Sequence, residues 1–96
     1  MRYALTRKAE DDVIAIFRSS VEQFGLQQAE RYHGLLAATF EFLAENPRAV
    51  RQREEIFPPV RVHPVGSHIV LYRIDGDEIL IIRIRHAHED WEGEAQ

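Results

Sequence analysis

Apolar residues recur every three to four positions along the first half of the chain, the spacing of a helix that buries one face. Over residues 7–24 this stripe consists of Ala9, Val13, Ile16, Phe17, Val21 and Phe24. Over residues 26–45 a second stripe consists of Ala29, Tyr32, Leu36, Phe40 and Leu43, widened by Leu35 and Phe42. Both patterns therefore predict amphipathic helices that pack on a shared core.

Capping residues mark where these two helices begin and end. Thr6 precedes the first stripe and is a good N-cap, while Gly25 follows it in the manner of a C′ glycine. Asn46-Pro47 ends the second helix, because the residue before a proline is pushed out of the α region. The one-glycine connection predicts an antiparallel helical hairpin over about residues 7–46.

The second half of the chain changes to an alternation of apolar and polar residues, typical of half-buried strands. A polar, arginine-rich loop precedes these strands, and Gly66-Ser67 and Asp75-Gly76-Asp77 supply turns between them. The predicted extended segments are 2–5, 60–65, 68–74 and 78–85. The order β-α-α-β-β-β predicts one α+β domain over residues 1–96. Its helical hairpin packs on one face of an antiparallel sheet of about residues 60–86, followed by an acidic tail, 87–96.

Strand alternation also assigns side chains to the two faces of the sheet. In the predicted strand 68–74, one face of the sheet receives Val70, Tyr72 and Ile74, and the other face receives Ile69, Leu71 and Arg73. In the strand 78–85 and the residue after it, one face receives Leu80, Ile82, Ile84 and His86, and the other face receives Ile79, Ile81, Arg83 and Arg85. A three-residue turn at 75–77 puts Arg73 on the side of Arg83 and Arg85, whereas a two-residue turn separates them. We favour the three-residue turn, because it gathers bulky aliphatic side chains under the helices and leaves the arginines outside.

Composition excludes several classes of protein. The chain has no cysteine, which rules out disulfides, thiolate metal sites, iron–sulfur clusters and a cysteine nucleophile. The first eight residues carry no apolar run behind their basic side chains, and no segment approaches the roughly 20 apolar residues of a membrane span. We therefore expect a cytoplasmic protein that does not contact membranes.

Charge is distributed unevenly along the chain. The net charge of −4 disfavours nucleic-acid binding, and we expect no direct sequence-specific contact with nucleic acid. Residues 47–86 nevertheless hold seven arginines against five acidic residues, and residues 87–96 hold four acidic residues without lysine or arginine. Arg73, Arg83 and Arg85 thus indicate a face that binds carboxylates or other anions. Ordinary solvated surface, with ion pairs to neighbouring glutamates, is the alternative interpretation.

Two histidines and a tryptophan near the end of the chain are further candidates. His86 and His88 lack a third ligand at a recognisable spacing, so we expect no metal site. His86 beside the arginines suits a general acid or base, or simply a hydrogen-bonded residue at a strand end. No glycine-rich phosphate loop, nucleophile elbow or carboxylate pair occurs, and we predict neither catalytic residues nor a cofactor. Trp91 is either a lid on the core or an exposed anchor for a partner.

Taken in order, these residues resemble the ParE-type toxins of the RelE/ParE superfamily. In the helical half the matching positions are Ala9, Asp12, Val13, Ile16, Phe24, Gly25, Ala29, Tyr32, Leu43 and Pro47. In the sheet, Phe57-Pro58-Pro59-Val60-Arg61 resembles the family's Pro-Gly-x-Arg entry, and residues 68–73 resemble its His-x-x-x-Tyr-Arg strand. Arg83-Ile84-Arg85-His86 with Asp90 resembles the closing Arg-x-Leu-His-x-x-x-Asp.

The resemblance implies a non-enzymatic toxin that blocks DNA gyrase and forms a hetero-oligomer with a neutralising ParD-like antitoxin. The implied target-binding residues are Arg61, Arg73, Arg83, Arg85, His86, Asp90 and Trp91. We expect the antitoxin to lay an amphipathic helix on exposed apolar residues of the hairpin and to continue as an extended segment beside the sheet. The expected anchors on the hairpin are Leu26, Leu35 and Phe42.

Two alternatives share the same fold. The first is a RelE-like ribosome-dependent mRNA endonuclease that uses Arg61, Arg83, Arg85 and His86. Against it, Ala87 stands where RelE-like toxins carry a catalytic basic residue, and no tyrosine follows Tyr72. The second alternative is a degenerate member that binds an antitoxin and has lost its toxicity.

Overall fold

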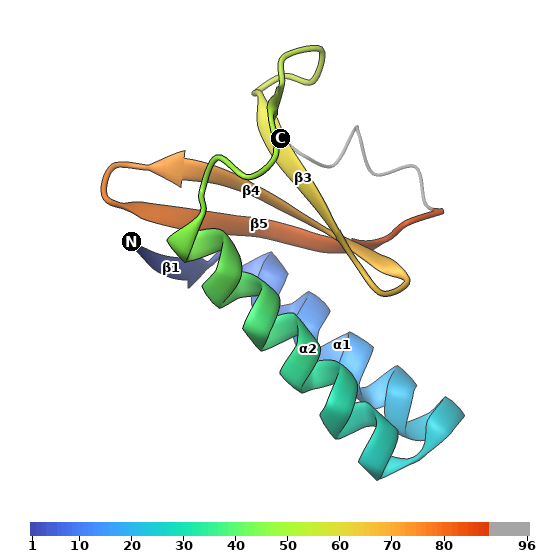
Figure 1. Ribbon diagram of the computed structural model, residues 1–96. Coiled ribbons are helices and arrows are strands. Elements are labelled where there is room, and N and C mark those ends of the chain that lie inside the picture. Colours follow the sequence, from blue (N-terminus) through green and yellow to red (C-terminus); the bar gives the residue numbers. More distant parts are fainter. Residues whose placement is uncertain (89–96) are drawn as a thin grey trace.

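The protein has two layers, a helical hairpin and a five-stranded sheet (Figure 1). The computed structural model describes residues 1–88, and its elements in chain order are β1 (Arg2–Leu5), α1 (Arg7–Phe24), α2 (Leu26–Glu45), β2 (Gln52–Arg53), β3 (Val60–Val65), β4 (His68–Asp75) and β5 (Glu78–His86). The strand order across the sheet is β1-β5-β4-β3-β2. The expected α+β architecture, with the hairpin on one face of the sheet, is confirmed.

The helix ends lie where the capping residues predicted them. Thr6 Oγ1 accepts a hydrogen bond from the Ala9 N–H at 3.1 Å, as an N-cap does. Gly25 joins the two helices with φ +89°, a value that favours glycine. At the other end of α2, the Asn46 N–H donates to Phe42 O at 2.8 Å. Neither helix of the described residues is long and apolar enough to cross a membrane.

The predicted antiparallel sheet of residues 60–86 is confirmed as β3, β4 and β5, and the whole sheet is mixed because β1 joins it in parallel. β1 runs parallel to β5, from Arg2 opposite Glu78 to Leu5 opposite Ile81. The loop before β3 also contributes a short strand, β2, which pairs with β3 at only two positions. Alternation along a sequence identifies strands, but it carries no information about which distant strand becomes the neighbour.

The turn between β4 and β5 has two residues, and the predicted three-residue turn is wrong. Asp75 pairs with Glu78, and Gly76 in the turn has φ +63°. Further along, Tyr72 pairs with Ile81 but Leu71 pairs with Arg83, so Ile82 is an extra residue in a β-bulge. The two-residue turn alone would put Arg73 on the face opposite to Arg83 and Arg85, and the extra residue in the bulge returns Arg83 and Arg85 to the face of Arg73. Arg73 therefore shares a face with Arg83 and Arg85 as predicted, for a different reason.

Each face of the sheet has its own apolar cluster. The main core under the helices includes Val70, Tyr72, Ile79, Ile81 and Ile84. The opposite face, called the outer face below, carries a smaller cluster made of Ile56, Val60, Ile69, Leu71 and Ile82, with Val62 beside it. Strict alternation along β5 placed Ile84 with Ile82 and opposite Ile79 and Ile81. That assignment is wrong, because the bulge shifts every side chain beyond Ile82 to the other face.

Candidate functional site

The helical hairpin exposes an apolar surface. Large apolar side chains are exposed at seven described positions, five of them on the hairpin: Met1, Ile14, Phe24, Leu26, Leu35, Phe42 and Phe57. The predicted anchors Leu26, Leu35 and Phe42 are 56%, 45% and 46% exposed, which confirms that they are accessible.

Two of these three predicted anchors lie on one side of α2. Leu35 and Phe42 are two helical turns apart and share a face with the exposed Ala38, whereas Leu26 at the hairpin tip lies on the opposite side of the helix. We call Leu35, Ala38 and Phe42 the α2 stripe. The Phe42 ring contacts the ring of His63 on β3, with centroids 5.8 Å apart. The α2 stripe therefore continues onto the edge of the sheet.

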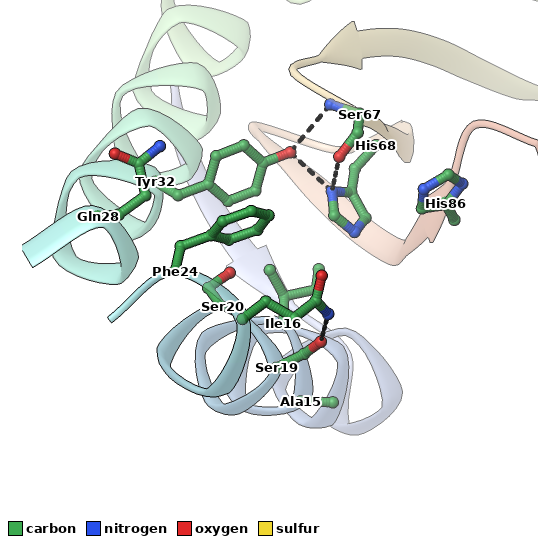
Figure 2. A pocket seen from close by; sticks show the side chains of 11 residues that line it. Ala15, Ile16, Ser19, Ser20, Phe24, Gln28, Tyr32, Ser67, His68 and His86 are labelled. Carbon is green, nitrogen blue, oxygen red and sulfur yellow. Dashed lines mark hydrogen bonds between the residues drawn. The ribbon is translucent and has the colours of Figure 1, made fainter. Parts of the chain in front are cut away.

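A pocket of about 590 Å³ opens between the hairpin and one end of the sheet (Figure 2). Its α1 wall includes Ile16 and Phe24, and its opposite wall includes Tyr32 of α2, His68 of β4 and His86 of β5. Among the described residues that line it there is no Asp, Glu, Lys or Arg. The pocket thus combines an apolar wall with hydroxyl, amide and imidazole groups that can form hydrogen bonds.

Tyr32 is the centre of the hydrogen bonds in this pocket. Its hydroxyl accepts from the Ser67 N–H at 3.2 Å and lies 3.1 Å from Val65 O and 2.6 Å from His68 Nδ1. A phenol has a single proton, so when it donates to Val65 O, His68 must carry its proton on Nδ1. These bonds attach α2 to the β3–β4 turn.

Gly66 in that turn is required by two independent features. Its φ of +56° lies in the left-handed region, and a Cβ placed there would lie 2.6 Å from the Tyr32 ring. The close approach of α2 to the turn therefore depends on the missing side chain.

The histidines form a row along the end of the sheet. His86 pairs across the strands with His68, with ring centroids 5.4 Å apart, and His88 follows at 5.5 Å from His86. Within residues 1–88 no three His, Asp or Glu side chains are grouped to hold a metal ion. Sequence reasoning had missed His68 as a pocket residue, although it lies in the segment that carried the family resemblance.

Arg83 is not an exposed residue, which corrects the sequence-based expectation. Its Nε donates to Asp12 Oδ2 at 2.8 Å and its Nη2 to Asp12 Oδ1 at 3.0 Å, and both side chains are only 14% exposed. This bidentate geometry is the strong form of an arginine–carboxylate pair. The expected carboxylate partner of Arg83 is thus supplied by α1 of the same chain.

Arg61 is also engaged within the protein. Its Nη1 donates to Val50 O at 2.6 Å, which holds the segment after α2 against β3. The neighbouring Tyr72 donates to Pro47 O at 2.9 Å, and burial raises the pKa of this phenol above its ordinary value. Both side chains therefore attach the loop to the sheet.

Arg73 and Arg85 are two predicted arginines that the strand register places on the outer face. Arg73 is exposed opposite Leu80, and Arg85 is half-buried opposite Ile69. Asp90 and Trp91, the remaining predicted target-binding residues, lie outside the described part of the chain. The structure thus places Arg73 and Arg85 on the same face, about four strand positions or ~13 Å apart along the sheet.

Comparison with known proteins identifies the family. Residues 3–91 match the family described as the ParE toxin of the type II toxin–antitoxin system parDE. Toxin ParE1 of Caulobacter vibrioides is 37% identical over 84 residues, which cover 88% of this chain and 86% of that protein. Toxin ParE1 of Mycobacterium tuberculosis is 32% identical over 90 residues, which cover 93% of this chain and 92% of that protein.

A solved structure shares the fold. The structure titled "Chromosomal ParDE TA system from P. aeruginosa" superposes with a TM-score of 0.78 at 26% identity, covering 90% of this chain and 95% of that chain. The family match over residues 3–91 spans the helical hairpin, the sheet and the strand end that carries His86. This chain belongs to the ParE toxin family of type II toxin–antitoxin systems.

Proposed function

We propose that this ParE-family chain blocks DNA gyrase in the cytoplasm by non-enzymatic binding, and that a ParD-like antitoxin neutralises it. The observation that carries the proposal is the separation of two accessible surfaces on the ParE fold. The apolar α2 stripe suits a protein helix, and the outer face with Arg73 and Arg85 suits an acidic partner.

Two features suit the binding of an antitoxin: exposed apolar side chains on α2 and an open edge of the sheet. Leu35 and Phe42 expose large apolar groups that a partner helix would remove from water. Phe42 reaches His63 on β3, and in the described structure β2 pairs only with Val60 and Arg61 of that strand. The rest of this edge offers unpaired backbone groups to an extended segment that follows the helix.

Two features favour gyrase as the target: the arginines of the outer face and the side chains that line the pocket. The outer face presents Arg73 and Arg85 in a chain of net charge −4, so two local cationic side chains rather than the whole molecule would attract an acidic protein surface. Among the described residues that line the Tyr32 pocket there is no Lys or Arg to stabilise a phosphoryl transition state. This favours gyrase binding over RNA cleavage.

Expression of the chain without an antitoxin tests the proposal. We expect growth arrest with DNA damage and altered supercoiling. Protein synthesis, measured by pulse labelling, should continue after growth has stopped. With purified components, the chain should inhibit gyrase supercoiling, and added antitoxin should restore it. Collapse of protein synthesis within minutes, with normal supercoiling, would instead identify a RelE-like ribonuclease. Antitoxin binding without any growth arrest would identify a degenerate toxin.

A further inference from the structure

Thr6 and Asp12, at the start of α1, contact four consecutive residues of β5. The Thr6 N–H donates to Ile81 O at 3.0 Å, and Thr6 Oγ1 donates to Ile82 O at 2.7 Å. Asp12 accepts two hydrogen bonds from Arg83, and its Oδ2 also accepts from the Ile84 N–H at 3.0 Å. Because β1 pairs with β5 only as far as Ile81, these two residues replace a strand along the next stretch of the edge.

This stretch contains the β-bulge. An extra residue interrupts the ladder of hydrogen bonds, and an unpaired backbone group away from water is costly. Thr6 supplies a donor to the carbonyl of the bulged residue Ile82. Asp12 supplies an acceptor to the amide of Ile84, the second residue after it. The contacts of α1 therefore fall on the backbone groups that the bulge and the end of β1 leave without a strand partner.

The bulge decides which side chains reach each face at the end of β5. With it, Ile84 is buried in the main core, Arg85 lies opposite Ile69 on the outer face, and His86 lines the Tyr32 pocket. Without the bulge, regular antiparallel pairing from the same two-residue turn would place Arg83 opposite the fully buried Val70 and Arg85 opposite His68. Burial of Ile84 requires an extra residue beyond Ile81, and Asp12 holds the strand immediately after it.

We propose that Asp12 is a positioning residue for target binding. By binding both the Arg83 guanidinium and the Ile84 amide, it keeps the end of β5 in the register that presents Arg85 on the outer face. Asp12 does not contact the target itself. The proposal rests on the proposed function, since it assigns Arg85 to the gyrase-binding surface. It adds that the arginine of the same strand, Arg83, serves the register and not the target.

The test compares Asp12→Ala with two control variants of α1. Asp11→Ala removes a neighbouring carboxylate that is 63% exposed and lies 3.6 Å from Arg7. Val13→Ala weakens the packing of α1 on the main core without removing a contact to β5 at Arg83 or Ile84. Purified gyrase is the probe, and inhibition of supercoiling is titrated for each variant. In parallel, NMR measures the cross-strand contact between Ile69 and Arg85 and the hydrogen exchange of the Ile84 amide.

We expect Asp12→Ala to need at least tenfold more protein for half-inhibition of gyrase. The Ile84 amide should exchange at least a hundredfold faster, and the contact between Ile69 and Arg85 should weaken. Asp11→Ala should match the wild type in every measurement. Val13→Ala should lower the melting temperature but keep the contact between Ile69 and Arg85. The variant Asp12→Asn, which keeps a neutral acceptor, should fall between the wild type and Asp12→Ala.

Two results would overturn the proposal. The first is a folded Asp12→Ala variant whose gyrase inhibition stays within twofold of the wild type. The second is lost inhibition with the contact between Ile69 and Arg85 intact, which would make Asp12 part of the binding surface. If the wild-type chain does not inhibit gyrase, the proposed function fails. The NMR measurements still decide whether Asp12 holds the register.

Discussion

The helical hairpin and the outer face of the sheet expose different chemistry. On the hairpin, Leu35 and Phe42 leave about half of their side chains in water. On the outer face, the apolar residues Ile69, Leu71 and Ile82 are buried by the small second cluster. The outer face also carries charge, with Arg73 exposed and Arg85 half-buried.

The difference indicates which surface is normally covered by a partner. Contiguous exposed apolar side chains on a small protein mark an interaction site, because their burial in a complex is strongly favourable. A charged surface is well solvated and does not promote aggregation when no partner is bound. We therefore expect the hairpin to be occupied by the antitoxin most of the time and the outer face to act when the antitoxin is absent.

The largest expected effect concerns the α2 stripe. Replacing Leu35 and Phe42 together with alanine should weaken antitoxin binding by about 4 kcal/mol, because each buried anchor contributes roughly 2 kcal/mol. Titration calorimetry with the cognate antitoxin measures this. Phe57→Ala is the control, since Phe57 is 80% exposed but lies on the loop before β3, apart from the hairpin (Figure 1). Unchanged affinity in the double variant would exclude the α2 stripe as the antitoxin site.

The next largest effect concerns the joint between the two regions. Gly66→Ala should lower the free energy of unfolding by about 3 kcal/mol, the sum of a left-handed backbone penalty and a clash with the Tyr32 ring. Urea denaturation measures the change. Gly34→Ala is the matched control, because nothing lies within 4 Å of the added methyl group in the interior of α2. That variant should gain roughly 0.5–1 kcal/mol; a similar loss in both would show that the clash does not matter.

The outer face should show a smaller effect, confined to the target. Arg73→Ala with Arg85→Ala should weaken gyrase inhibition about thirtyfold, or ~2 kcal/mol. The melting temperature should change little, because exposed charges contribute at most about 1 kcal/mol each to folding. Supercoiling assays and thermal melts test both statements. A well-folded double variant that inhibits gyrase as the wild type does would move the target surface elsewhere, whereas reduced antitoxin affinity would show that the two surfaces overlap.

The smallest effect concerns Tyr72, which attaches the loop after α2 to the sheet. Burial raises its pKa above the ordinary value of about 10, so the unfolded chain ionises first as the pH rises. This contribution to stability is complete below pH ~10 and is lost as the pH rises through the higher pKa of the folded state. Tyr72→Phe should cost about 1 kcal/mol at pH 7, through the lost bond to Pro47 O.

The same variant should also flatten the loss of stability above pH ~10. Urea denaturation at pH 7 and above pH 10 measures both effects, with Tyr3→Phe on β1 as the control for the loss of another phenol. An identical alkaline slope in the wild type and in Tyr72→Phe would contradict the assignment.

Local features of the sequence determined the hairpin and its ends. The apolar period of a helix, the Thr6 cap, Gly25 and Asn46-Pro47 act within a few residues, so each can be identified without knowledge of the rest of the chain. The helical pattern alone assigned Leu35 and Phe42 to the widened buried stripe, and their exposure was expected only from the family resemblance. The family resemblance in the two halves, confirmed by comparison with ParE toxins, also rested on motifs of this local kind.

Tertiary structure alone decided the placement of β1, the bulge in β5 and the fate of Arg83. Ile79, Ile81, Ile82 and Ile84 are chemically alike, so alternation cannot show where an extra residue breaks it. The bulge is stabilised by Thr6 and Asp12, which lie 76 and 71 residues away in the chain from their partners Ile82 and Arg83. The sequence identified Asp12 only as a position of the family resemblance and Arg83 as part of an anion-binding face. Their bidentate contact depends on packing between segments that are distant in the chain, for which a single sequence carries no local signal.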